Sequence, residues 1–183
     1  MKTFFNLILV FSVSLLLCTA KANAQLLVGA GPVYSLPLSD FADYNKASFG
    51  GTVFIGSRKY CNLWTGMRLD YIAYSQVDPA VTPVYFQDAL VLSPEFRYFF
   101  SPATEFPVYL QGMLSFSGIK GTDEASRTGL GAGGGVGIVF PYSTNCDWFI
   151  DANVRYMAPN LLRSDDRPAL SSLTASITFN FGI

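Results

Sequence analysis

The chain has 183 residues, with 12 Lys and Arg against 13 Asp and Glu, and it contains no histidine. Its length fits a single domain, and its small negative charge, without any basic cluster, argues against nucleic-acid binding. The lack of histidine excludes a Ser-His-Asp triad, the usual histidine-rich metal sites and a histidine general base.

The first 24 residues predict a cleaved secretory signal peptide. Lys2 supplies the positive charge, Phe4–Cys18 forms the apolar region, and Ala22-Asn23-Ala24 is a small-x-small cleavage site. The apolar region is short for a membrane span, which needs about 20 residues, so a retained anchor helix is the weaker alternative. We therefore expect a signal peptide at 1–24 and a single mature domain at 25–183.

The mature chain alternates apolar and small polar residues with a period of two. In the final segment, Leu173, Ile177 and Phe179 alternate with residues such as Thr174 and Thr178, as on a strand between an oily and a wet environment. Strands of 9 to 14 residues suit a tilted membrane-spanning strand, which needs about 9–11. Eight strands are predicted: Leu26–Leu36, Phe49–Ser57, Leu63–Gln76, Ala89–Phe100, Val108–Ile119, Leu130–Phe140, Asp147–Met157 and Leu170–Ile183.

The connections between these segments alternate between short and long. This alternation is typical of an up-and-down barrel with one rim in the periplasm and the other outside. With eight strands, both ends of the chain fall on the side of the short turns. The short turns are Arg58–Asn62, Ser101–Pro107 and Pro141–Cys146, and the longer loops are Pro37–Ser48, Val77–Asp88, Lys120–Gly129 and Ala158–Ala169.

Alternation alone does not decide which face is inside, because a soluble barrel would turn its apolar face inward. The polar faces here consist mainly of Gly, Ser, Thr and Asn, with very little Lys, which suits a crowded lumen better than a solvated exterior. They also pool three arginines with three acids at mid-strand, a balance that suits mutual pairing of buried charges. We expect this lumen charge network to comprise Arg68, Asp70, Glu95, Arg97, Asp151 and Arg155.

Aromatic residues near strand ends favour the same orientation, because outer-membrane barrels carry aromatic girdles at both interfaces. Pro32 and Pro94 fall inside predicted strands, and proline cannot donate to a strand ladder. We therefore expect bulges or a shortened strand at both prolines. The predicted girdle residues are Tyr34, Phe100, Phe140, Trp148, Tyr156, Phe179 and Phe181.

Other candidate sites are weaker. The Gly131–Gly137 run lacks the Lys-Ser/Thr and the helix of a phosphate-binding loop, so a lumen-facing glycine strand is the better interpretation. Asp123-Glu124 and Asp165-Asp166 lie in loops and offer carboxylates to a divalent cation, although solvated acidic loops are commoner. Cys61 and Cys146 lie in turns on the oxidising side, but those turns are across the barrel from each other, and whether they are bridged stays open.

The leader, the strand count, the loop asymmetry and the final segment Ile177–Ile183 together resemble the small outer-membrane β-barrel family, the OmpA/OmpX-like and OmpW-like eight-stranded proteins. The cleavage context is similar to that of Bacteroidetes secreted proteins. The resemblance implies an all-β, eight-stranded antiparallel up-and-down transmembrane barrel. It also implies that the C-terminal strand, which ends in Ile rather than the commoner Phe, is recognised by the barrel-assembly machinery.

The sequence thus predicts a non-enzymatic integral outer-membrane protein, without cofactor or metal, whose lumen is plugged by Arg/carboxylate pairs. Its expected role is structural or surface interaction, and its expected partners are outer-membrane lipid, lipopolysaccharide among them; we expect a monomer. Two alternatives stay open: a narrow channel for small or hydrophobic solutes, and a soluble periplasmic barrel that binds a small apolar ligand.

Overall fold

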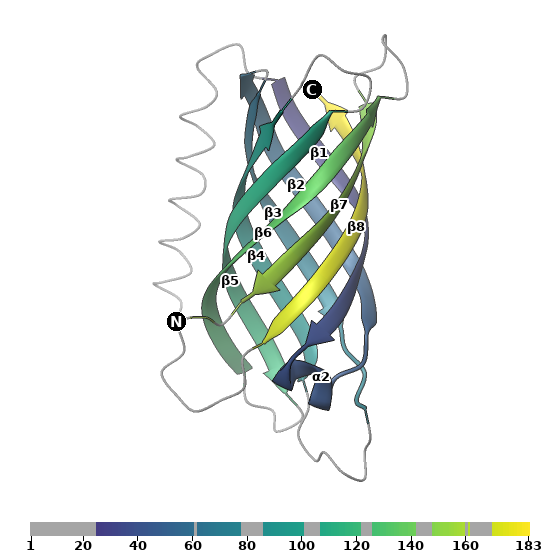
Figure 1. Ribbon diagram of the computed structural model, residues 1–183, viewed down its shortest axis with the longest axis vertical. Coiled ribbons are helices and arrows are strands. Elements are labelled where there is room, and N and C mark those ends of the chain that lie inside the picture. Colours follow the sequence, from purple (N-terminus) through teal and green to yellow (C-terminus); the bar gives the residue numbers. More distant parts are fainter. Residues whose placement is uncertain are drawn as a thin grey trace.

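The computed structural model is a closed, all-antiparallel barrel in which each strand pairs with its sequence neighbours and β1 closes onto β8 (Figure 1). It describes residues 25–60, 62–77, 86–100, 107–121, 126–141, 148–159, 161 and 170–183. This confirms the predicted fold class. The strands are β1 Gln25–Leu38, β2 Ser48–Tyr60, β3 Leu63–Ala73, β4 Phe86–Phe99, β5 Val108–Gly121, β6 Ser126–Pro141, β7 Trp148–Ala158 and β8 Ser171–Gly182.

The period of two in the sequence is an alternation between lumen and exterior. On β8, Leu173, Ile177 and Phe179 are 40–50% exposed, whereas Thr174 and Thr178 are fully buried. The other strands follow the same pattern, so the apolar rows face outward over most of the barrel. A soluble barrel would place these rows in its interior. The outward orientation of the apolar rows therefore agrees with a membrane-spanning barrel. It argues against the alternative of a soluble periplasmic barrel that binds a small apolar ligand.

Strand boundaries differ from the prediction mainly at the loop end, the barrel end that carries the connections after β1, β3, β5 and β7. The third strand ends at Ala73 rather than at residue 76, and a short helix, α2 Asp40–Tyr44, occupies the connection after β1. The α2 helix lies at the end of the barrel opposite the C-terminus (Figure 1). Strands β5 and β6 are longer than expected and leave only residues 122–125 between them. The predicted strict alternation of short and long connections is therefore wrong at this one connection.

The two prolines interrupt the ladder without changing its register. Pro32 stays paired with Gly51 of β2, but the β1–β8 pairing stops after Ala30 and resumes at Val33 in the same register. Pro94 behaves alike: β4 keeps its pairing with β3, while its pairing with β5 lapses between Leu92 and Glu95. Since proline lacks only the N–H on one side, a local gap is sufficient. The bulges expected at these positions are absent.

Several sequence predictions fall outside the described residues. These are the signal peptide at 1–24, the possible bridge between Cys61 and Cys146, and the acidic pairs Asp123-Glu124 and Asp165-Asp166. Within the described ranges, no helix is both long and apolar enough to span a membrane.

Candidate functional site

The middle of the lumen holds a continuous chain of charged side chains. Glu95 on β4 accepts hydrogen bonds from Nε of Arg68 and from Nε of Arg97, each at 2.8 Å. Nη1 of Arg97 in turn lies 2.8 Å from Oδ2 of Asp151 on β7. All four residues are buried, with at most 4% exposed. The carboxylate of Glu95 therefore bridges two arginines, and Arg97 carries the chain from β4 across to β7.

A separate ion pair braces the barrel across its full width. Arg155 on β7 donates from Nη1 to Oδ2 of Asp70 on β3 at 2.9 Å, and both side chains are fully buried. Strands β3 and β7 are four places apart in a ring of eight, so they stand on opposite walls. The six predicted network residues thus lie together in the lumen as one four-membered chain and one pair, with three positive and three negative charges.

Polar neighbours add further hydrogen bonds to this network, although Nη2 of Arg97 and Nε of Arg155 have no hydrogen-bond partner among the described residues. Arg68 also donates to Thr52 on β2 at 3.2 Å and to Ser176 on β8 at 3.4 Å. The Tyr109 hydroxyl donates to Oδ1 of Asp151 at 2.6 Å, and Ser176 donates to Oδ1 of Asn153 at 2.9 Å. Burying an unpaired charge is costly, whereas a charge that is paired and hydrogen-bonded is tolerated. These hydroxyls and amides therefore help the charged side chains on the polar face of each strand to be buried in a narrow lumen.

The turn end of the lumen, where β1 begins at Gln25 and β8 ends at Gly182, holds a buried apolar cluster. Phe54, Trp64, Phe99 and Tyr109 pack there, with ring centroids of Trp64 and Phe99 separated by 4.4 Å and those of Phe99 and Tyr109 by 5.0 Å. The guanidinium of Arg97 lies 4.1 Å from the centroid of the Phe54 ring. A cation over an aromatic face is stabilised by the ring quadrupole. The apolar cluster therefore packs directly against the charged layer. Leu27 and Val139 complete it.

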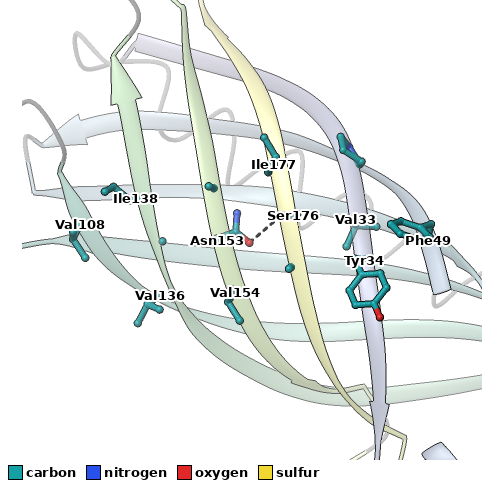
Figure 2. A pocket seen from close by; sticks show the side chains of 14 residues that line it. Val33, Tyr34, Phe49, Val108, Val136, Ile138, Asn153, Val154, Ser176 and Ile177 are labelled. Carbon is teal, nitrogen blue, oxygen red and sulfur yellow. Dashed lines mark hydrogen bonds between the residues drawn. The ribbon is translucent and has the colours of Figure 1, made fainter. Parts of the chain in front are cut away.

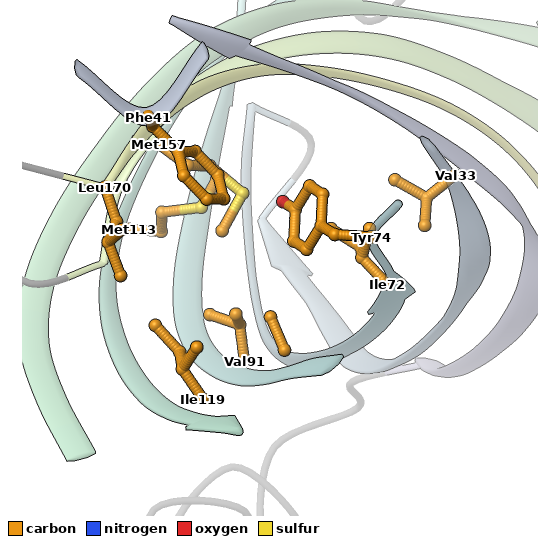
Figure 3. Packing of buried hydrophobic residues seen from close by; sticks show 10 residues of the cluster. Val33, Phe41, Ile72, Tyr74, Val91, Met113, Ile119, Met157 and Leu170 are labelled. Atoms are coloured by element: carbon orange, nitrogen blue, oxygen red, sulfur yellow. The ribbon is translucent and has the colours of Figure 1, made fainter. Parts of the chain in front are cut away.

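A second apolar cluster closes the loop end. Figure 3 shows Phe41, Met157 and Tyr74 facing into the barrel mouth, and the rings of Phe41 and Tyr74 pack edge to face with centroids 4.9 Å apart. Tyr74 shares a hydrogen bond of 2.9 Å with Ser35, and its burial raises the pKa of this phenol to about 12. A cavity of about 20 Å³ lies among the described residues of the cluster, enough for one water-sized molecule. Its other members are Val33, Ile72, Ala89, Val91, Met113, Ile119 and Leu170.

The glycines of β6 make room for these lumen side chains. A Cβ at Gly137 would collide with the Tyr109 ring. One at Gly133 would come within 2.7 Å of the Tyr156 carbonyl oxygen and within 3.2 Å of Cγ of Met113. A Cβ at Gly131 or Gly135 would meet the backbone that follows or forms β7. The glycine run therefore serves packing, as a lumen-facing glycine strand should, and its backbone forms no phosphate-binding loop.

The outer wall carries a furrow of about 550 Å³ over strands β5 to β8, β1 and β2. Figure 2 shows Val136 on β6, Val154 on β7 and Tyr34 on β1 along it, with β8 between the last two and Phe49 beside Tyr34 at one end. The two ring centroids of that aromatic pair are 5.0 Å apart. Outward alanines at 152 and 175 lower the floor of the furrow between larger neighbours.

Exposed aromatic side chains gather towards both ends of the outer wall. Tyr34 and Phe49 lie at the loop end of β1 and β2. At the turn end, the predicted girdle members Phe100, Phe140 and Phe181 are exposed, together with Tyr98. The aromatic rows therefore border the outward aliphatic residues as a girdle does.

Chemically, the lumen offers ion pairs rather than a reactive centre. Among the described residues, no group of three Cys, Asp or Glu side chains is placed to hold a metal ion. Each lumen carboxylate faces an arginine within 2.9 Å. The sequence interpretation missed the two apolar clusters that seal the lumen. The signal was present on β4, whose inward row runs Val91, Ser93, Glu95, Arg97 and Phe99, apolar at both ends and polar between.

Comparison with solved structures places this fold among small outer-membrane barrels. Neisserial surface protein A matches with a TM-score of 0.66 at 17% identity, over 88% of this chain and 99% of its own. Ail, the attachment invasion locus protein of Yersinia pestis, gives 0.51 at 13% identity over 86% and 99%. A major outer membrane protein of Thermus thermophilus gives 0.52 at 15% identity over the same shares. No family model and no curated protein matches the sequence. The expected resemblance is confirmed at the level of the fold.

Proposed function

We propose that this protein is an integral outer-membrane β-barrel with a structural or surface-interaction role and no enzymatic activity. The observation that carries the proposal is the inverted distribution of polarity. Three arginines and three carboxylates are buried inside, while large apolar side chains such as Phe96, Leu114 and Ile177 are half exposed outside. A soluble protein rarely exposes a continuous apolar belt of this kind to water, whereas a barrel that spans a bilayer needs such a belt on its outer wall.

The lumen favours a closed barrel over a channel. Side chains fill the bore of an eight-stranded barrel, and here the ion pair of Asp70 and Arg155 spans it from wall to wall. The loop-end and turn-end clusters cover the charged layer on both sides. A narrow channel for small or hydrophobic solutes is the second candidate, and it would need all three layers to open.

The same geometry supports a proposal about partners. Outer-membrane lipid covers the apolar belt, and lipopolysaccharide meets the loop end if the longer connections face outward, as in outer-membrane barrels generally. The C-terminal strand, with exposed Phe179, Phe181 and Ile183, supplies a signal for the barrel-assembly machinery. The closed ring leaves no strand edge for pairing with another copy, which supports a monomer.

Two measurements test the proposal. Expressed with its leader, the protein should fractionate with the outer membrane and show a heat-dependent shift on a gel. Reconstituted in planar bilayers, it should give no stable single-channel steps in small salts. Recovery in aqueous buffer without detergent would refute the membrane location, and reproducible conductance that Arg97→Met or Glu95→Gln alters would favour the channel.

A further inference from the structure

We propose that the lumen binds water at two separate sites on the wall formed by β4, β5 and β6. The first site lies beside Gly135 and uses Gln111, and the second lies beside Gly131 and uses Ser93 and Ser115. The inference goes beyond the proposed function, because it concerns the interior of the barrel and not its location. It starts from buried polar atoms that have no hydrogen-bond partner in the part of the chain that the structure describes.

The inward row of β5 alternates between large and polar side chains, and each stands beside a glycine of β6. The ladder pairs are Tyr109 with Gly137, Gln111 with Gly135, Met113 with Gly133 and Ser115 with Gly131. The two large side chains lie close over their glycines. No side chain comes as close to Gly135 or Gly131, because the three atoms nearest to an added Cβ there all belong to the backbone. The two polar residues of β5 therefore stand beside the two glycines that a large side chain does not cover.

At the first site, three hydrogen-bonding side chains lie on one row of the barrel. Arg97, Gln111, Gly135 and Arg155 are successive ladder partners. Gln111 is only 5% exposed, and neither polar atom of its side chain has a partner among the described residues. Neighbouring strands lie about 4.8 Å apart, and Gly135 places no side chain between Gln111 and Arg155. Because a buried polar atom without a partner is costly, this row favours a small hydrogen-bonding molecule that serves Gln111, Nη2 of Arg97 and Nε of Arg155.

The second site lies where Pro94 interrupts the ladder between β4 and β5. The register continues across the interruption and sets Ser93 directly opposite Ser115. Both residues are at most 1% exposed, and their hydroxyls have no partner within the described ranges. Opposite residues have Cβ atoms about 4.5–5.5 Å apart, and water commonly bridges polar groups that are too far apart for a direct hydrogen bond. Towards the loop end the site stops at Ser117, which donates to the Pro159 carbonyl at 3.1 Å.

The chemistry of both sites selects water over an ion or an apolar molecule. Gln111 needs both a donor and an acceptor, and water supplies both. The charged layer already balances three arginines against three carboxylates, so a bound anion would add an uncompensated buried charge. An apolar molecule would leave all of these polar atoms unsatisfied. A buried water typically makes about three hydrogen bonds, which Gln111, Arg97 and Arg155 can provide.

Met113 separates the two sites. It lies between Gln111 and Ser115 on the inward row of β5 and belongs to the buried loop-end cluster. Met113 and Met157 are both ladder partners of Gly133, and Figure 3 shows both side chains inside the barrel. A thioether sulfur is only a weak hydrogen-bond acceptor, so these side chains disfavour a continuous file of water. We therefore expect two separate sites and no water-filled channel.

The direct test is solution NMR of the isotope-labelled full chain in detergent micelles, with water-selective NOE and ROE spectra. The side-chain amide of Gln111 and the Nε–H of Arg155 should show cross-peaks to water whose NOE and ROE have opposite signs, as bound water gives. The Val139 methyl groups, in the turn-end cluster, are the internal control and should show none. Absence of water cross-peaks at Gln111 and Arg155 would overturn the first site. Cross-peaks that extend to Val139 would reveal a continuous file and overturn the separation into two sites.

The second test is a substitution whose effect changes sign with the outcome. Gln111→Met keeps the length of the side chain and removes both polar atoms. If water links Gln111 to its arginine neighbours, the urea midpoint of the full chain should fall. If no water is bound, removing two unsatisfied buried atoms should raise the midpoint or leave it unchanged, which would overturn the first site. Gln87→Met, at a partly exposed position near the loop end of β4, is the matched control and should leave the midpoint unchanged.

Ser115→Ala applies the same reasoning to the second site. The urea midpoint should fall if water bridges Ser115 to Ser93, and a raised or unchanged midpoint would overturn that site. Neither the NMR spectra nor the urea midpoints depend on the outer-membrane fractionation that tests the proposed function, so the two proposals can fail separately.

Discussion

Removing the carboxylate of Asp70 should destabilise the barrel more than any exposed charge change. Asp70→Asn preserves the side-chain shape but leaves the guanidinium of Arg155 without its partner on the opposite wall. The other two lumen carboxylates cannot replace it, because Glu95 already bridges Arg68 and Arg97 and Asp151 pairs with Arg97. The variant therefore creates an uncompensated buried charge.

The magnitude follows from the geometry. Two unit charges about 4 Å apart attract by about 4 kcal/mol at an effective dielectric constant of about 20. Breaking a buried pair by removing one partner costs about 3–5 kcal/mol of the free energy of unfolding. Adding Arg155→Met removes the stranded charge, so the double variant should lose only about 1–3 kcal/mol, the cost of an unsatisfied buried polar group. The second substitution should thus restore stability.

Urea unfolding in detergent micelles or lipid vesicles, followed by tryptophan fluorescence, measures these differences. Asp43→Asn, on the exposed face of α2, is the control and should change the free energy of unfolding by no more than about 0.5 kcal/mol. If Asp70→Asn is as mild as Asp43→Asn, or if the double variant is no more stable than the single one, water screens the lumen charges and the lumen is not plugged.

Three further substitutions test separate parts of the structure. Gly137→Ala should cost about 1–3 kcal/mol of unfolding free energy, because the added Cβ meets the Tyr109 ring. Gly51→Ala, with open space around residue 51, is the control and should cost less than about 1 kcal/mol. Equal costs would contradict the packing role of the β6 glycines. Ile177→Lys should destabilise the protein by about 2–4 kcal/mol in vesicles if residue 177 faces the bilayer interior, and an unchanged unfolding midpoint would contradict the membrane reading. Absorbance titration should find one phenol with a pKa of about 12 that Tyr74→Phe removes. Since the folded pKa is raised above the ordinary value of about 10, the stability that Tyr74 contributes is complete below pH 10 and falls as the pH rises towards 12.

The sequence was sufficient to predict the barrel because the local period and the global architecture agree. On β8, every outward residue is apolar or small, so the alternation determines both which side of the strand faces outward and the register in which the strand can pair. The prediction is less accurate at the loop end. The strand β3 ends at Ala73, although the Tyr74 N–H still donates to the Gln87 carbonyl at 2.7 Å, and the Tyr74 ring continues the inward alternation and packs against Phe41 of α2. The α2 helix has only five residues and buries Phe41 against the loop-end cluster, and helices this short depend on tertiary packing rather than on a signal of their own.

The composition of the charged layer was predictable, but its connectivity was not. Alternation places Arg68, Glu95 and Arg155 on the inner face without reference to other strands. Which acid each arginine meets depends on strand stagger, and Arg155 finds its partner Asp70 on the opposite wall, 85 residues away in the sequence. Glu95 serves two arginines at once, an arrangement that counting charges cannot distinguish from simple pairs.

The layering of the lumen bears on where specificity can reside. Buried apolar clusters lie on both sides of the charged layer, with Phe41 in one and Phe99 in the other, so the described lumen charges are placed to stabilise the barrel. We therefore expect recognition at the rims or on the outer wall.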